Sequence, residues 1–284
     1  MKNDYLLPVA IRCNNTEFLW GQRTYIMGII NVSPDSFSGD GLGKNIKAIV
    51  EQAKRFIAEG ADIVDVGGES TRPESQPITA EEELRRVIPA IERLVVEISA
   101  PISIDTSKSV VAIRAIRAGA FMVNDVWGLK NDPKIAGVAA DAGVPIVITS
   151  NQRNEPCQGD IVAEVISDLK KSMTLAKEYG VTEDNIIVDP GIGFGKTVGQ
   201  NLELIRRLAE LKSLGRPILL GTSRKSVIGL VLDLPLDQRL EGTAATVAIG
   251  IANGANIIRV HDVKQMVRVC RMSDAIIRRN RDEH

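Results

Sequence analysis

Cysteine and aromatic residues are scarce in this sequence, and each scarcity excludes some classes of protein. The three cysteines, Cys13, Cys157 and Cys270, lie far apart and form no CxxC pair. Neither a disulfide framework nor a zinc site is therefore expected, and a reduced, cytoplasmic compartment follows. Aromatic residues make up only 4% of the chain, which suits a core of aliphatic strands and alanine-rich helices.

Long apolar runs and net charge are also lacking. No run approaches the roughly 18 residues of a membrane helix, and the N-terminus opens with Lys2 and Asp4 rather than with an apolar segment. The net charge is −1, which gives no global electrostatic reason to bind nucleic acid or an acidic membrane surface. The sequence predicts a soluble protein that binds neither.

Short apolar runs do recur along the chain, with a charged segment of helical period between each pair. The strand candidates are residues 25–30, 62–66, 102–104, 121–123, 145–148, 186–188, 217–220 and 257–260. Predicted helices between them include residues 46–59, 80–98, 110–118, 161–179 and 202–214, where apolar residues recur three and four apart. Eight strands that alternate with helices predict an α/β fold, a single-domain (β/α)₈ TIM barrel, for which 284 residues is a typical length.

The N-terminal segment has a different pattern. Residues 8–23 alternate loosely and contain the turn signal Asn14-Asn15, which predicts a short hairpin that plugs one end of the barrel. We therefore divide the chain into a hairpin extension, residues 1–24, and a barrel, residues 25–284.

Polar residues end the strand candidates, where barrel enzymes carry their chemistry. In chain order they include Asn31, Asp65, Asp105, Asn124, Thr149, Asp189, Ser223 and Arg259. One such residue is more often a helix cap than a ligand, but eight in register are hard to explain as caps. We expect Asn31, Asp105, Asn124, Asp189, Lys225 and Arg259 to open onto one mouth of the barrel.

A glycine-rich loop follows the sixth strand candidate, which ends in Asp189. A P-loop would need glycine at the position of Pro190, and a dinucleotide fingerprint would need glycine or alanine at the position of Lys196. Neither motif is therefore present. We expect the glycines to let the backbone and the Phe194 ring close over a flat ligand. Asp189 is then a candidate ligand group, with a helix cap or a turn carboxylate as the alternative.

These stretches together resemble the dihydropteroate synthases, folate-pathway enzymes of the pterin-binding barrel family. The resemblance covers nearly the whole chain and is specific, since several motifs are long and unusual. One of them reads Asp65-Val66-Gly67-Gly68-Glu69-Ser70-Thr71-Arg72-Pro73; the others are residues 27–38, 103–106, 123–126, 189–196, 221–226 and 259–263.

The resemblance implies a transferase that joins 6-hydroxymethyl-7,8-dihydropterin diphosphate to p-aminobenzoate and releases diphosphate, with Mg²⁺ as cofactor. It implies an SN1-like course, in which diphosphate leaves before the arylamine attacks, and this suits a sequence with no obvious nucleophile. It further implies a cytoplasmic homodimer that is a sulfonamide target.

The resemblance also implies a role for each motif residue. Asp189, Asp105 and Asn124 would bind the hydrogen-bond donors of the pterin edge and the neighbouring ring nitrogens, and Lys225 the acceptor side. Arg259 and His261 share a strand face and would hold the diphosphate, with Asn31 on Mg²⁺. We take Asp105, Lys225, Arg259 and His261 as catalytic. The remaining substrate-binding candidates are Phe194 and, for the benzoate, Phe37, Thr71, Arg72 and Ser226.

Alternatives stay open for some of these residues. His261 could be structural and Asp262 could cap the next helix, while Lys225 could be a solvated lysine at a helix end. The glycine- and proline-rich segments 33–43 and 67–77 read as loops that could close over the second substrate.

The sequence departs from the family pattern after the fifth strand. The family commonly has a Met-His-Met-Arg-Gly-like turn, whereas this chain reads Thr149-Ser150-Asn151-Gln152-Arg153-Asn154. Thr149 replaces a methionine that would pack on the pterin, which predicts weaker binding by about 1 kcal/mol or more. Two other functions remain open: a methyltransferase that carries a methyl group from methyltetrahydrofolate to a corrinoid protein, and a non-catalytic pterin-binding paralogue. The segments 223–226 and 259–261 favour the synthase.

Overall fold

The structure is a computed structural model that describes residues 10–13, 16–32, 42–70 and 76–278. Its main sheet is made of β3 (Tyr25–Asn31), β4 (Ile63–Gly67), β5 (Ile102–Asp105), β6 (Met122–Asp125), β7 (Ile146–Thr149), β8 (Ile186–Asp189), β9 (Leu219–Leu220) and β10 (Ile257–Val260). These strands are parallel and run in the order β8-β7-β6-β5-β4-β3-β10-β9. A parallel bridge between Val188 and Ile218 joins the two ends. The predicted (β/α)₈ barrel is confirmed.

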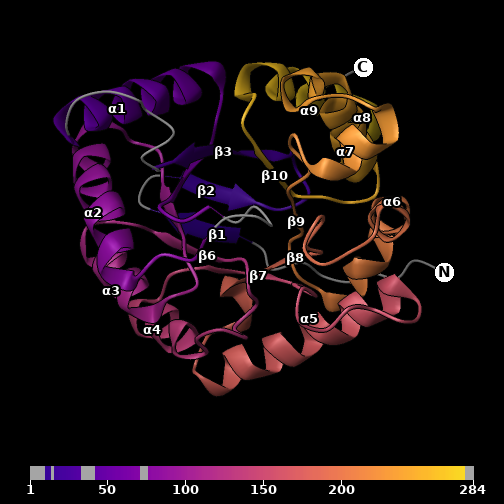
Figure 1. The fold of residues 1–284 in the computed structure, drawn as a ribbon, viewed down its shortest axis with the longest axis horizontal. Helices are drawn as coiled ribbons and strands as arrows, with labels where there is room; N and C mark the ends of the chain where they lie inside the picture. The colour runs from indigo at the N-terminus through magenta and orange to yellow at the C-terminus, as the bar shows by residue number, and fades with distance from the viewer. Residues whose placement is uncertain (1–9, 14–15, 33–41, 71–75, 279–284) are drawn as a thin grey trace.

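Helices surround the strands, as Figure 1 shows. In the described residues they are α1 (Leu42–Glu59), α2 (Ala80–Glu97), α3 (Ser109–Arg117), α4 (Lys134–Ala142), α5 (Ile161–Glu178), α6 (Val198–Arg206), α7 (Ser226–Leu232), α8 (Leu240–Ala252) and α9 (Val263–Ile277). Local signals fix several ends: the Thr79 side chain caps α2, and Thr197 and Gln200 form a capping box on α6. No helix among these residues is long and apolar enough to cross a membrane.

One predicted helix, residues 202–214, is wrong. The chain forms α6, which ends at Arg206, and then a separate 3₁₀ helix, η3 (Leu208–Leu214). In η3 the buried side chains are Leu208, Leu211 and Leu214, spaced three apart. Three residues per turn is the repeat of a 3₁₀ helix, so this spacing keeps all three leucines on the side facing the core.

The N-terminal hairpin is present and closes one end of the barrel. Strands β1 (Ala10–Cys13) and β2 (Thr16–Leu19) pair antiparallel, while the turn signal Asn14-Asn15 lies outside the described residues. Phe18 and Trp20 are buried and meet the Tyr25 ring edge-on, with centroid distances of 5.0 and 5.5 Å. Because Tyr25 begins β3, these rings fill the barrel at the N-terminal ends of the strands.

Alternation along the strands divides the barrel interior into layers. The hairpin rests on an apolar layer that includes Met27, Ile63, Met122, Val147, Ile187, Leu219 and Ile257. Intervening residues such as Val64, Ile104, Val123 and Ile148 belong to the outer core under the helices. Side chains two residues further along each strand face inward again, and here they are mainly polar: Asp65, Asp105, Asn124, Thr149, Asp189 and Arg259. We call these six residues the polar layer.

Candidate active site

The polar layer lies at the carboxyl ends of the parallel strands, the end opposite the hairpin. Arg259 joins three strands across it: its Nε donates to Asp65 Oδ2 at 2.6 Å and its Nη2 donates to Asp105 Oδ2. Asn124 Nδ2 donates to the same Asp65 oxygen at 3.2 Å. Asn31 ends β3 and Lys225 follows β9, so the expected convergence on one mouth is confirmed.

Burial shifts the pKa of the ionisable groups in this mouth. It raises the pKa of Asp105 to about 7, an effect that Arg259 opposes and Asp65 reinforces. It also raises the pKa of Asp189, against the attraction of Lys225, and lowers the pKa of Lys225 to about 8. Burial thus disfavours the charged forms of Asp105, Asp189 and Lys225, and shifted pKa values of this kind are typical of functional sites.

Asp189 has the turn role that the sequence left open as an alternative. Its Oδ1 accepts the backbone N–H of Gly191 at 2.7 Å, so the carboxylate does shape a turn. No described residue donates a hydrogen bond to its Oδ2. One oxygen thus fixes the loop while the other remains as an acceptor for a ligand.

Lys225 is not a solvated lysine. Its Nζ donates to the Ile192 carbonyl and lies 4.4 Å from the centroid of the buried Phe194 ring. The Arg153 guanidinium is 4.9 Å from the same ring centroid. Phe194 therefore holds two cations at the mouth through their attraction to its π-face.

The glycines after β8 serve a contact between loops that we did not expect. Gly191 and Gly195 both have φ of 71°, and a Cβ on them would lie 2.0 Å from Ser150 O and 2.3 Å from Gln152 C, respectively. Gln152 N donates to Phe194 O at 3.2 Å across this contact, and Lys196 Nζ donates to Ser150 O at 2.7 Å. The glycines let the loops after β7 and β8 pack backbone to backbone.

His261 is held at the mouth by the loop after β9. Ser223 Oγ accepts the backbone N–H of His261 and lies 3.1 Å from His261 Nδ1. In the neutral tautomer in which Ser223 donates to Nδ1, the proton sits on Nε2, which can donate to an anion.

Asp262 does not cap α9 with its side chain; its Oδ2 accepts from Arg224 Nε at 2.8 Å. Arg224 has a left-handed φ of 57°, and its backbone N–H donates to Thr243 Oγ1. This ion pair ties the loops after β9 and β10 together, directly beside Lys225 and His261.

Two groups that the structure brings to this region had no role assigned from the sequence. Asp65 is fully buried beneath Arg259, and only its inward position in the alternating run Ile63-Val64-Asp65-Val66 signals this. Lys108 Nζ pairs with Glu69 and, at 2.6 Å, with Glu83, which is itself fully buried. Glu83 lies in the first turn of α2, and no local pattern indicates its distant partner.

Some predicted site residues are exposed and others cannot be placed. Asn31 and Ser226 are exposed, at the end of β3 and the start of α7. Phe37, Thr71 and Arg72 lie outside the described residues, as do parts of the predicted closing loops 33–43 and 67–77.

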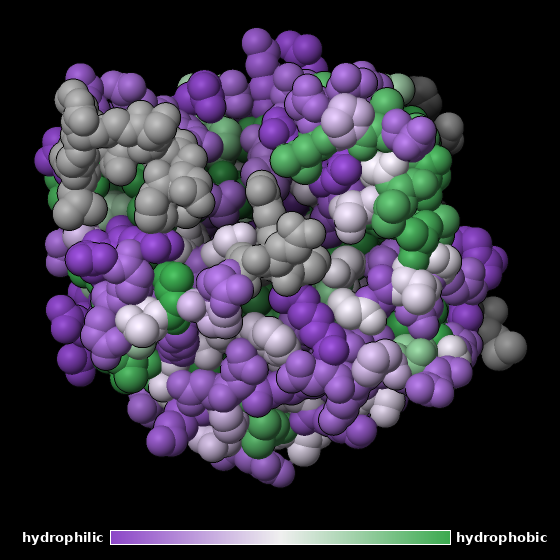
Figure 2. Space-filling view, viewed as in Figure 1, coloured by the Kyte–Doolittle hydropathy of each residue, from purple (hydrophilic) through white to green (hydrophobic). Residues whose placement is uncertain are grey.

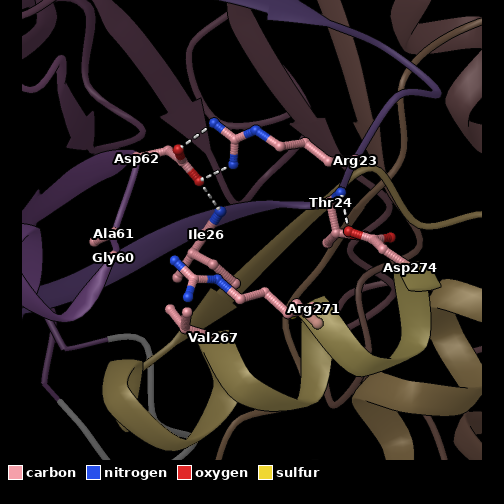
Figure 3. Close-up of a pocket in the computed structure, with 10 residues that line it drawn as sticks. Arg23, Thr24, Ile26, Gly60, Ala61, Asp62, Val267, Arg271 and Asp274 are labelled. Carbon is pink, nitrogen blue, oxygen red and sulfur yellow. Dashed lines mark hydrogen bonds and ion pairs between the residues drawn. The ribbon is translucent and has the colours of Figure 1, made fainter. Parts of the chain in front are cut away.

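A cavity of about 480 Å³ lies at the other end of the strands, beside the residues that precede β3 and β4 (Figure 3). Three of its four charged lining residues make contacts within the protein: Arg23 pairs with Asp62, and Asp274 accepts from the backbone and side chain of Thr24. In barrels of this kind the N-terminal end serves stability. The polar layer is therefore the candidate active site.

Comparison with known proteins agrees with this choice. The model of the family described as "Pterin binding enzyme" matches residues 27–261. The chain belongs to this family. A dihydropteroate synthase of Bacillus subtilis is 49% identical over 263 residues, covering 93% of this chain and 92% of the relative. The dihydropteroate synthase of Escherichia coli is 39% identical, covering 89% of this chain and 92% of the relative.

Solved structures of dihydropteroate synthases are also similar to this chain. The crystal structure of a dihydropteroate synthase from Clostridium difficile, determined in the presence of pteroic acid, has a TM-score of 0.89 and 50% identity, covering 92% of this chain and 99% of its own. A dihydropteroate synthase of Xanthomonas albilineans with 4-aminobenzoic acid has a TM-score of 0.89 and 39% identity, covering 95% and 98%. The chain is accordingly a transferase with the function of these relatives in folate biosynthesis, and the methyltransferase and binding-protein alternatives are not favoured.

Proposed function

We propose that the polar layer binds 6-hydroxymethyl-7,8-dihydropterin diphosphate and that p-aminobenzoate joins it at the mouth. The observation that carries this assignment is the convergence of Asp105, Asn124 and Asp189 at the closed end of a mouth that also holds Arg259 and Lys225. Acceptors and donors so arranged match a flat heterocycle whose edge alternates donors and acceptors. Figure 1 shows the strands that carry these residues surrounded by the helices.

The geometry supports the following contacts to the ring in this proposal. Asp189 Oδ2 accepts from the donor edge of the pterin, and Asp105 and Asn124 contact the neighbouring ring nitrogens. Lys225, which rests on Phe194, donates to the acceptor side after it leaves the Ile192 carbonyl. Phe194 holds Lys225 and Arg153 close to the pterin ring through its π-face.

The diphosphate end needs cationic and donor groups. His261 Nε2 is one donor, and Arg259 supplies positive charge although its guanidinium is also paired with Asp65 and Asp105. We assign Asn31 to Mg²⁺, because an exposed amide oxygen beside a diphosphate suits an ion that takes few protein ligands and completes its shell with phosphate oxygens and water. No cluster of histidine, cysteine and acidic side chains suited to a metal occurs in the described part of the chain. Bound there, Mg²⁺ would neutralise charge on the diphosphate.

The reaction then needs positioning and electrostatics rather than a nucleophile from the protein. Breaking the bond between the C9 methylene and the diphosphate oxygen leaves a cation on the pterin and negative charge on diphosphate, which His261 and Arg259 stabilise. The arylamine nitrogen attacks C9 and loses a proton. Phe37, Thr71, Arg72 and Ser226 are proposed to hold p-aminobenzoate, and a sulfonamide would compete there.

A turnover assay tests the proposal. Diphosphate release should require both p-aminobenzoate and Mg²⁺, and Lys225→Ala should reduce it by roughly 10- to 100-fold, since a charge-assisted contact contributes about 1.5–3 kcal/mol. Lys212→Ala, far from the mouth in η3, serves as the control with wild-type rates. A wild-type protein that binds the pterin diphosphate but releases no diphosphate on addition of p-aminobenzoate would contradict the proposal.

We also propose that the protein is a cytoplasmic homodimer that pairs through α7 and α8. Large apolar side chains are exposed on these helices and on the segment between them: Leu230, Val231, Leu236 and Ile249 are 70%, 51%, 42% and 49% exposed. Figure 2 shows this apolar surface at the upper right, over the helices labelled α7 and α8 in Figure 1. The run Leu240–Ala252 of α8 is apolar on nearly all sides, which is typical of a helix that becomes buried.

Leu230→Glu is expected to convert the dimer to a monomer, because it places a charge within an apolar contact. Sedimentation velocity at micromolar protein gives the mass of the species directly. Val96→Glu, a substitution of a residue that is 79% exposed on α2, is the matched control and should stay dimeric. A wild-type protein that sediments as a monomer, or a Leu230→Glu variant that remains a dimer, would place the contact elsewhere or exclude it.

A further inference from the structure

Thr149, the last residue of β7, carries a buried hydroxyl that the fold does not use. The residue is 1% exposed, and its Oγ1 has no hydrogen-bond partner among the described residues. The neighbouring hydroxyl, Ser150 Oγ, donates to Asp168 Oδ2 at 2.7 Å, so a hydroxyl in this loop can find a hydrogen-bond partner within the protein. Buried hydroxyls are nearly always hydrogen-bonded, and an exception needs a physical explanation.

The position of Thr149 suggests what that partner is. Val147, two residues earlier, faces the interior of the barrel, and Thr149 is the register partner of Asp189 on β8. Side chains directly opposite on adjacent strands are neighbours on one face, so Thr149 lies beside Asp189 in the polar layer. It therefore stands next to the carboxylate proposed to bind the donor edge of the pterin.

We propose that Thr149 Oγ1 hydrogen-bonds to the ring edge of the bound pterin next to the position contacted by Asp189. A hydroxyl both donates and accepts, so it can complement a ring nitrogen or an N–H at that edge. A methionine at this position could pack on the ring but could not make such a bond. This inference rests on the proposed function, and it makes Thr149 a residue that sets ring specificity.

Thr149→Val tests the inference, because valine keeps the shape and removes only the hydroxyl. Calorimetry with 6-hydroxymethyl-7,8-dihydropterin and with its diphosphate should show both ligands weakened by about 3- to 10-fold, since the lost contact is to the ring. Thr149→Ser should bind within about 2-fold of wild type. Ser103→Ala removes another unpartnered hydroxyl from the layer below Asp105 and should leave both affinities unchanged.

The stability of the ligand-free protein separates a binding role from a structural one. Thr149→Val should unfold at the wild-type temperature or higher, because it removes an unsatisfied group. Thr243→Val should unfold at a lower temperature, because Thr243 Oγ1 accepts from Arg224 N and donates to Arg239 O.

Unchanged affinity in Thr149→Val would overturn the inference, as would a loss of stability like that of Thr243→Val. If wild type binds neither pterin, the proposed function fails instead, which these measurements distinguish.

Discussion

Replacing Arg259 by methionine is expected to lower the thermal unfolding temperature much more at pH 8 than at pH 5. The variant leaves Asp65, which is fully buried, and Asp105 without their shared cation. Breaking a buried ion pair from one side costs about 3–5 kcal/mol, so a decrease on the order of 10 °C is expected at pH 8. Scanning calorimetry across pH measures this directly.

The direction of the pH effect follows from Asp105. Burial already raises its pKa from 3.8 to about 7, and Arg259 opposes that rise. A carboxyl whose folded pKa is raised favours folding at low pH, and this stability is lost as pH rises from about 4 to 7. Without Arg259 the pKa rises further and the loss continues above pH 7, whereas at pH 5 the protonated carboxyl needs no cation.

Arg207→Met is the control for this experiment. Arg207 also pairs with several carboxylates, Asp160, Glu203 and Glu210, but on the surface, where such pairs contribute little. Its unfolding temperature should change little at either pH. An Arg259→Met variant with equal losses at pH 5 and pH 8 would mean that the charges of Asp65 and Asp105 are not what Arg259 offsets.

Asp189→Asn is expected to abolish most pterin binding while leaving the fold intact. Asparagine can still accept the Gly191 N–H through its side-chain oxygen, so the turn after β8 is kept. Its amide N–H groups then face the donor edge of the ligand. The loss of a charge-assisted contact with donors left unpaired amounts to roughly 3 kcal/mol, or about 100-fold in affinity.

Calorimetry with the pterin alone gives this affinity, and the unfolding temperature checks the turn. Asp132→Asn is a useful comparison, because Asp132 also accepts a backbone N–H, that of Ser109, but does not belong to the polar layer and should not alter binding. Unchanged affinity in Asp189→Asn would restrict Asp189 to its role in the turn.

The strand pattern made much of this site predictable, because alternation is a local property. The run Ile186-Ile187-Val188-Asp189 predicts both a buried strand and a carboxylate at its end, and both are present. Pairings between distant residues could not be predicted in the same way. Arg259 and Asp65 are 194 residues apart, and the sequence suggested a role for Arg259 at the diphosphate rather than a structural ion pair.

The glycine loop and the 3₁₀ helix show the same limit. Gly191 and Gly195 are required because another loop approaches them, and that loop comes from β7. Three leucines spaced three apart fit either a distorted α-helix or a 3₁₀ helix, and the core surface they cover decides between them.

The aromatic hairpin at the N-terminal end has a consequence for the order of events. Because Phe18 and Trp20 fill the barrel at that end, the proposed site opens only at the carboxyl ends of the strands. Substrates and products therefore enter and leave through the same opening. On the proposed assignments the pterin occupies the bottom and p-aminobenzoate the rim, so a benzoate that docks early obstructs the pterin behind it. The order in which the two substrates bind is then set by how deep each one lies in the site rather than by their relative affinities. The pterin half of the product is the last part to leave.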